Sequence, residues 1–231
     1  MRRIAASVVA LTALVSTTGT ARAATADQEQ AEAAVLTEAD VPTGFTGGPY
    51  TDTSRAPVLR ACKGAIARAD RMVESSPIAR SAFQLSDTRA YALIENAVAV
   101  LASQQQAKRA MAAYAQETAA EACIQARMDD AFTETGIGTT VAVGSFDPST
   151  DSTGSAKIIQ GGDDFYGFAG SIRRMVGGAP QFFEYQVVLA REGRAVTQLV
   201  IVAQGSIPPA EARQMLQTVV TRMGDITRSK R

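Results

Sequence analysis

The clearest strand pattern of the chain lies in Gln181–Ala203, with the sequence QFFEYQVVLAREGRAVTQLVIVA. In its first half, apolar and aromatic residues alternate with polar ones, a spacing that puts the two kinds on opposite faces of a strand. One face would be core and the other partly wet, as in an antiparallel sheet. The segment 191–194 (REGR) contains a glycine and suits a tight reversal. These residues therefore predict a hairpin of two strands, 181–191 and 194–203.

The segments next to this hairpin extend it in both directions. Residues 165–175 are expected to form a further strand, which the reversal GGAP at 177–180 joins to the hairpin. Downstream, a final helix is expected to open at Pro208-Pro209. The apolar residues of this helix recur at helical spacing along one face: Ala212, Met215, Leu216, Val219, Met223 and Ile226.

The rest of the chain alternates between helical and extended patterns. Strands are expected at 80–86, 90–101 and 139–146, and helices at about 56–73 and 103–128, the second rich in alanine. Residues 47–54 are expected to form a loop. The predicted fold class is α+β, a single domain in which an antiparallel β-sheet packs against helices, with one disulfide.

The N-terminus has the three parts of a secretory signal peptide. A basic start precedes an apolar run at Ile4–Val15, and residues 21–23 (ARA) form an A-x-A cleavage site. A second A-x-A at 24–26 means that cleavage is expected after Ala23 or Ala26. The apolar run is shorter than the roughly 20 residues that span a membrane, and no cysteine lies nearby for a lipid anchor. We therefore expect a secreted, extracellular protein.

The same boundaries divide the chain into three parts. Residues 1–23 are the signal peptide, 24–35 an N-terminal lead-in, either frayed or a short helix, and 36–228 the folded domain. In the segment 36–45 (LTEADVPTGF), Thr37 can cap a helical turn that Pro42 stops. Gly44 then allows the turn that brings the next residue, a phenylalanine, inward.

Composition excludes several classes of function. The chain has no histidine, so Ser-His-Asp and Cys-His catalysis and imidazole metal sites are excluded, and its two cysteines cannot build a Cys₄ site. Removal of residues 1–23 takes away three arginines and leaves 20 basic against 23 acidic side chains. Such a chain lacks the basic excess of a nucleic-acid binder or of a protein that binds anionic membranes. We expect a monomer without a metal or cofactor.

The two cysteines, Cys62 and Cys123, are expected to form a structural disulfide, because an exported protein folds in an oxidising compartment. A redox-active pair would need close spacing such as CxxC, which is absent. The chain-entropy model assigns a loop of this length a stabilisation of about 4 kcal/mol.

The order of several landmarks resembles a known family. The opening 36–45 precedes a cysteine on an early helix and a second one near the end of an alanine-rich helix. A Gly162-Asp163 step and the hairpin 188–196 (VLAREGRAV) follow. In this order the chain is similar to the secreted and membrane-proximal sensor-domain proteins of actinobacteria, the PknH-like extracellular sensor domains. The resemblance implies a sandwich-like α/β domain whose cleft holds an unidentified small-molecule or envelope-derived ligand. The chain departs from the kinase sensors in having no kinase, no membrane segment and one cysteine pair instead of two disulfides.

Carboxylates are the first candidate site residues. Glu95 lies inside an apolar strand, where a buried carboxylate needs a partner such as Arg173 or Arg174. The alternative is a catalytic pair of Glu95 and Glu184, as in glycosidases. Glycosidases usually line their sites with aromatic residues for sugar stacking, and this chain has no tryptophan.

A second candidate is the Asp163-Asp164 pair, which could bind a cation or act as acid and base at the edge of a cleft. Adjacent strand residues point to opposite faces, so the two are not expected to pair simply, and the competing interpretation is a solvated loop. Asp147 and Asp151 lack the glycine and glutamate of an EF-hand. No G-x-S-x-G elbow, P-loop or dinucleotide fingerprint occurs.

The leading hypothesis is a secreted, non-enzymatic binding protein of the sensor type, holding a small-molecule or envelope-derived ligand in a cleft. The aromatic residues would line an apolar cleft if the sheet is half open, and would otherwise be core. The alternatives are a secreted hydrolase that depends on carboxylates, and a protein–protein interaction module with an exposed apolar patch. The candidate ligand-binding residues are Glu95, Asp163, Phe165, Tyr166, Glu184 and Tyr185.

Overall fold

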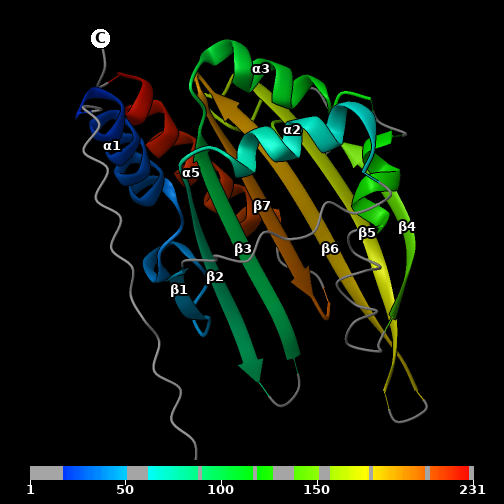
Figure 1. Ribbon diagram of the computed structural model, residues 1–231. Coiled ribbons are helices and arrows are strands. Elements are labelled where there is room, and N and C mark those ends of the chain that lie inside the picture. The colour runs from blue at the N-terminus through cyan, green and yellow to red at the C-terminus, as the bar shows by residue number, and fades with distance from the viewer. Residues whose placement is uncertain are drawn as a thin grey trace, which may run out of the picture.

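A single antiparallel sheet of seven strands, in the order β1-β2-β3-β7-β6-β5-β4, forms the centre of the computed structural model (Figure 1). The structure describes residues 18–50, 62–87, 90–116, 119–126, 138–150, 157–176, 179–205 and 209–228. The strands are β1 Thr46–Tyr50, β2 Ile78–Asp87, β3 Ala90–Val100, β4 Gly138–Phe146, β5 Asp164–Val176, β6 Ala179–Glu192 and β7 Ala195–Ala203. The helices are α1 Thr18–Ala34, the 3₁₀ turn η1 Glu38–Asp40, α2 Gly64–Glu74, α3 Gln104–Ala112 and α5 Pro209–Arg228, and residues 119–126 are also helical.

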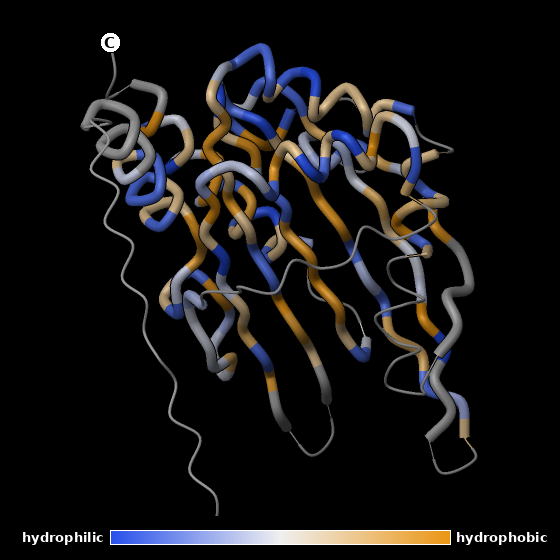
Figure 2. Tube along the Cα trace, viewed as in Figure 1, coloured by the Kyte–Doolittle hydropathy of each residue, from blue (hydrophilic) through white to orange (hydrophobic). Residues whose placement is uncertain are grey.

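The helices cover both faces of the sheet. Helices α1 and α5 pack on one face, and α2 and α3 pack on the other (Figure 1). The strands carry apolar residues between the helical layers (Figure 2). Two buried clusters result, one on each face, because side chains alternate across each strand. The expected α+β class, with an antiparallel sheet, one domain and one disulfide, is confirmed.

The hairpin predicted from Gln181–Ala203 lies at the heart of this sheet. Strand β6 pairs antiparallel with β7 around the turn at 193–194, and β7 pairs antiparallel with β3 on its other side. On β6, Phe183, Tyr185 and Val187 all face the cluster beneath α2 and α3. The final helix is also confirmed, and its apolar residues from Met215 to Ile226 are buried against the opposite face.

Three local expectations are corrected. The loop expected at 47–54 contains a strand, since β1 pairs along the outer edge of β2. Pro49 is tolerated there because an edge strand leaves one row of backbone groups unpaired. The first helix begins at Gly64, and Cys62 precedes it; residues 51–61 lie outside the described part of the chain.

The third correction concerns the long alanine-rich helix expected at 103–128, which is interrupted by a turn at residues 113–116. Helix α3 ends at Ala112, and the Tyr114 N–H bonds to the Met111 carbonyl three residues earlier at 2.9 Å. The Tyr114 side chain turns inward, and its hydroxyl donates a hydrogen bond to the buried carboxylate of Asp70 on α2. This contact outweighs the helix propensity of the alanines, which is a weak preference per residue.

The disulfide between Cys62 and Cys123 ties the chain two residues before α2 to the helical stretch 119–126, with 4.8 Å between the two Cα atoms. Both residues are buried. The bridge therefore joins the two ends of the helical layer that covers one face of the sheet.

The N-terminal segment packs onto the opposite face. Residues 24–34 belong to α1, so the short-helix alternative is the one that the structure adopts. Thr37 caps η1 in a capping box, and Phe45 turns into the core after Gly44, whose φ is 98°. Within the described residues, no helix is both long and apolar enough to cross a membrane; the apolar run at Ile4–Val15 lies outside them.

Candidate functional site

A cavity of about 600 Å³ lies between the N-terminal half of α5 and the sheet. Its floor is formed by side chains of β6 and β7, its roof by α5, and its side wall by the end of β4 and the turn that follows. Its lining residues are Phe146, Asp147, Pro148, Thr150, Ile158, Gln186, Val188, Leu199, Ile201, Pro209, Ala212, Arg213 and Leu216. Most of these side chains are apolar, and four are polar or charged.

The side wall of the cavity is fixed by a short antiparallel bridge. Thr150 pairs with Lys157, and the Ile158 N–H donates to the Ser149 carbonyl at 2.7 Å. Asp147 begins the turn, because its Oδ1 accepts hydrogen bonds from the Ser149 N–H at 2.8 Å and hydroxyl at 2.7 Å. These contacts fix the shape of the wall, which continues directly from the end of β4.

A reciprocal pair of hydrogen bonds ties the next segment to α5. The Gln217 amide accepts from the Gln160 N–H at 2.7 Å and donates to the Gln160 carbonyl at 2.8 Å. Gln217 lies one residue beyond Leu216, which lines the cavity. The roof and the side wall are thus held together at the middle of the helix.

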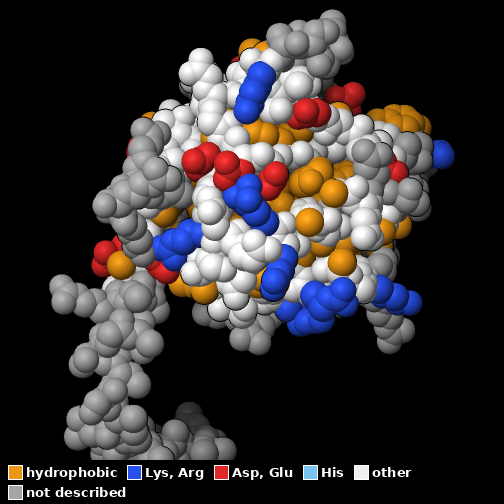
Figure 3. All heavy atoms as spheres, turned by 90° about the horizontal axis from the view of Figure 1, so that it is seen from above, with side chains coloured by type: hydrophobic (Ala, Val, Ile, Leu, Met, Phe, Trp, Pro, Cys, Tyr) orange, Lys and Arg blue, Asp and Glu red, His pale blue; other side chains and the backbone are white. Residues whose placement is uncertain are grey.

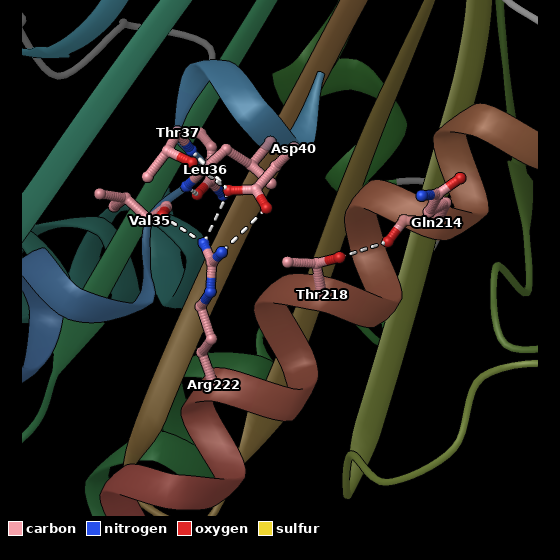
Figure 4. A network of polar contacts seen from close by, with 8 residues as sticks. Val35, Leu36, Thr37, Asp40, Gln214, Thr218 and Arg222 are labelled. Carbon is pink, nitrogen blue, oxygen red and sulfur yellow. Dashed lines mark hydrogen bonds and ion pairs between the residues drawn. The ribbon is translucent and has the colours of Figure 1, made fainter. Parts of the chain in front are cut away.

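The C-terminal half of α5 is fixed by an ion pair with the N-terminal segment (Figure 4). Arg222 donates from both terminal nitrogens to Asp40, at 2.9 and 2.8 Å, and also to the Val35 carbonyl at 2.9 Å. Asp40 in turn accepts from the Thr37 N–H at 2.8 Å and hydroxyl at 2.7 Å. A guanidinium held by both oxygens of a carboxylate has little freedom to rotate, so α5 is oriented by these contacts.

The contacts of Asp40 also set its acidity. Burial is the largest single influence and raises the pKa, but the hydrogen bonds from Arg222 and Thr37 together outweigh it. The pKa of Asp40 therefore lies below its ordinary value of 3.8. Because the folded state favours the ionised form, this carboxylate stabilises the fold above that value and loses its effect as the pH falls through the lowered pKa.

A second, much smaller cavity of about 120 Å³ lies beneath α2 and α3. Its polar lining includes the Asp70–Tyr114 pair, Arg80 and Gln198. A water molecule occupies roughly 30 Å³ in the liquid, so this space suits a few waters. Sites for organic ligands are usually several times larger.

The structure places Glu95 on the face of β3 that α2 and α3 partly cover, with its side chain exposed. The expectation that the Glu95 side chain is buried is therefore wrong. Gln84 on the neighbouring strand β2 is exposed as well, so α2 and α3 do not cover this part of the sheet. Surrounding protein still displaces water from the carboxylate and raises the pKa of Glu95 above 4.5, partly offset by the charge of Arg80. Arg173 and Arg174, the partners expected from sequence, lie on β5, which β7 and β6 separate from β3.

Asp163 and Asp164 meet at one guanidinium, contrary to the expectation that they would not pair. Arg191, which is 3% exposed, donates to Asp163 at 2.6 Å and to Asp164 at 2.5 Å. Asp163 also accepts from the Gly193 N–H at 2.9 Å. The two carboxylates can converge because Asp163 precedes the strand and Asp164 is its first residue. Together they clamp the turn between β6 and β7.

The remaining expected site residues are divided between the two faces. Phe165 packs with the α1 and α5 cluster, while Tyr166 and the fully buried Tyr185 belong to the α2 and α3 cluster. Burial, and then the charge of Asp164, raise the pKa of Tyr166 above 10.0. Glu184 alternates with buried Phe183 and Tyr185 and so faces the side opposite to Glu95. The sheet therefore separates the two carboxylates of the expected catalytic pair.

None of the six residues expected at the site lines either cavity described above. The cavity beneath α5 is lined instead by residues for which the sequence pattern did not predict a ligand-binding role. Leu216 and Ala212 belong to the apolar stripe of the final helix, and Asp147 was weighed only as a calcium ligand. The alternating pattern of β6 places Gln186 and Val188 on one face, which is the signal that could have identified the floor.

On the described part of the surface, the large exposed hydrophobic residues do not come from one strand or helix. The exposed large hydrophobic residues are Tyr50, Phe146 and Phe182, which lie on three different strands. On the face seen from above, acidic and basic side chains both appear, with apolar groups between them (Figure 3).

Replacing Asp40 by asparagine should lower the free energy of unfolding by about 1–3 kcal/mol at pH 7, because the charged partner of Arg222 is lost. The difference from wild type should shrink as the pH falls below 3.8, where the wild-type carboxyl group takes up its proton. Urea unfolding from pH 7 to pH 3 measures both effects. Glu38→Gln, an exposed neighbour on the same turn, is the control and should change little. An unchanged unfolding free energy in Asp40→Asn at pH 7 would contradict the role given to this ion pair.

Comparison with known proteins found no matching family model and no matching curated protein. Among solved structures, the chain is similar to the extracellular domain of PknH from Mycobacterium tuberculosis, with a TM-score of 0.46 and 14% sequence identity. The match covers 87% of this chain and 96% of that one. This is a distant likeness, which assigns neither a ligand nor a residue role to the chain.

Proposed function

We propose that this protein is a non-enzymatic binding protein that holds a small molecule in the α5 cleft, the cavity between the N-terminal half of α5 and the sheet. The observation that carries the proposal is the size and lining of this cavity. Its volume of about 600 Å³ falls within the range of roughly 300–1,000 Å³ that is usual for ligand sites. Mostly apolar walls with a few polar groups are also usual for such sites.

The chemistry of the lining favours binding over catalysis. Its charged members are one carboxylate, Asp147, and one guanidinium, Arg213. The two carboxylates that a glycosidase requires are not both present in this lining. Thr150 is the only hydroxyl-bearing residue among the lining residues described, and no histidine exists in the chain to activate it. The lining therefore provides contacts for a ligand rather than groups for acid–base chemistry.

We also propose that the protein is exported and that residues 1–23 or 1–26 are removed. Support comes from the A-x-A sites and from the disulfide, which fits an oxidising compartment. Cleavage at either site keeps Asp27, whose carboxylate pairs with the guanidinium of Arg194 at the turn between β6 and β7. It also keeps Ala31 and Ala34, which are buried residues of α1.

The binding proposal predicts that the uncharged, apolar dye Nile red will bind to the full chain with enhanced fluorescence. Ala212→Trp places a large ring in the α5 cleft and should weaken binding at least about tenfold, because the apolar volume is then filled. Ala210→Trp, on an exposed position of the same helix, is the matched control and should bind as wild type does. Far-UV circular dichroism and the Tm check that both variants fold.

Two results would overturn the binding proposal. One is failure of the wild-type protein to bind Nile red, and the other is equal binding by Ala212→Trp and wild type. Either would show that the α5 cleft does not accept an apolar molecule.

The export proposal predicts that the protein recovered from the culture medium of its own host begins at Ala24 or Asp27. Intact-mass spectrometry and N-terminal sequencing measure this directly. The mass should also show the two-hydrogen deficit of a closed disulfide. Retention in the cell with Met1 intact, or cleavage beyond Asp27, would contradict the proposal.

A further inference from the structure

We propose that the ligand of the α5 cleft is an amphipathic monoanion, a long apolar body that ends in a single carboxylate, and that Arg213 binds this carboxylate. This inference rests on the binding function proposed above and specifies the chemical class of the ligand. The residues that carry it are the apolar floor of the cleft and the guanidinium at its helical wall.

The interior of the cleft selects an apolar body. Val188, Leu199 and Ile201 form the floor from two adjacent strands, and Leu216 faces them from α5. Val188 and Leu199 are directly paired residues of β6 and β7, so they form a continuous apolar surface. An apolar chain lying there would be removed from water over its length, which is favourable in proportion to the area buried.

Arg213 is an exposed residue whose terminal hydrogen-bond donors no described residue accepts. Its Nε donates to the Pro209 carbonyl at 3.0 Å, which fixes the base of the guanidinium against the first turn of α5. Its two terminal nitrogens make no hydrogen bond or ion pair with any residue in the described ranges. By contrast, Arg191, Arg194 and Arg222 each donate from at least one terminal nitrogen to a protein oxygen. A guanidinium with free terminal donors matches the two oxygens of a carboxylate.

Asp147, the other charged residue of the lining, has a structural task. Its Oδ1 holds the Ser149 N–H and hydroxyl and so fixes the turn of the side wall. Its negative charge also limits the charge of the ligand. The charged members of the lining are one guanidinium and one carboxylate, so a ligand with one negative charge meets less repulsion there than a phosphate monoester with two. We therefore infer a carboxylate as the head group.

Three probes of equal chain length separate the possible head groups: decanoate, 1-decanol and decylamine. Each is titrated against Nile red bound to the full chain, in wild type and in Arg213→Gln. Decanoate should displace the dye from wild type at a concentration about tenfold lower than 1-decanol does, because a charge-assisted hydrogen bond is added to the same apolar contact. Arg213→Gln should remove this preference while still binding Nile red and 1-decanol.

Two further variants test whether the effect is specific to the site. Arg71→Gln removes an exposed arginine from α2, on the other face of the sheet, and should keep the preference for decanoate. Asp147→Asn keeps an oxygen for the Ser149 contacts and removes the negative charge, so it should bind decanoate at least as tightly as wild type does.

The outcomes distinguish this inference from the function on which it rests. If Nile red binds but decanoate displaces it no better than 1-decanol does, the anion inference is overturned and the binding function stands. If decylamine displaces the dye best, Asp147 holds the head group and the inference is again overturned. If wild type does not bind Nile red, the binding function itself fails.

Discussion

The α5 cleft depends on how one helix is fastened to the sheet. The ion pair between Arg222 and Asp40 fixes the C-terminal half of α5 to the N-terminal segment, and the Gln160–Gln217 hydrogen bonds fix its middle. Beyond these contacts, Val219, Met223 and neighbouring apolar residues are fully buried, and each such side chain contributes roughly 1.5–3 kcal/mol. The N-terminal half also buries Met215 and Leu216, and the cavity lies beneath the first two turns of the helix.

The polar residues at the β6–β7 turn also have a structural role. Arg191 is almost fully buried, and a buried guanidinium requires partners for its charge. Asp163 and Asp164 supply them, while the Gly162 N–H donates to Glu192 at 2.8 Å. At Gly162 a side chain would collide with the Phe165 ring, because an added Cβ would lie 2.2 Å from the ring. Residues that looked like a cation or acid–base site thus hold the central hairpin in place.

Sequence patterns predicted the parts of the fold that depend on local alternation. The β6–β7 hairpin, the strands on either side of it and the amphipathic α5 follow from spacing alone, because each buries one regular face. The break after α3 did not follow, since it coincides with long-range contacts that local patterns do not show, the hydrogen bond from Tyr114 to Asp70 and the disulfide of Cys123. Strand β1 was missed for a related reason: two glycines and a proline pair with β2 only because that edge is free.

The site was harder to predict than the fold, because a cleft is a property of packing between elements. Arg213 belongs to a helix whose apolar stripe indicates only that the helix packs against a core. Gln186 belongs to the face of its strand that the alternating pattern predicts to be more polar. Which half of α5 lies close to the sheet depends on partners far along the chain, Asp40 and Gln160. Conversely, Glu95 and Glu184 looked like a pair in sequence but lie on opposite faces.

A crystal structure of the protein grown with decanoate would show whether the α5 cleft binds an amphipathic carboxylate. We expect density for the ligand between α5 and the β6–β7 floor, with its carboxylate within hydrogen-bond distance of the terminal nitrogens of Arg213. A cleft filled by the protein's own side chains, or decanoate bound elsewhere, would contradict this expectation.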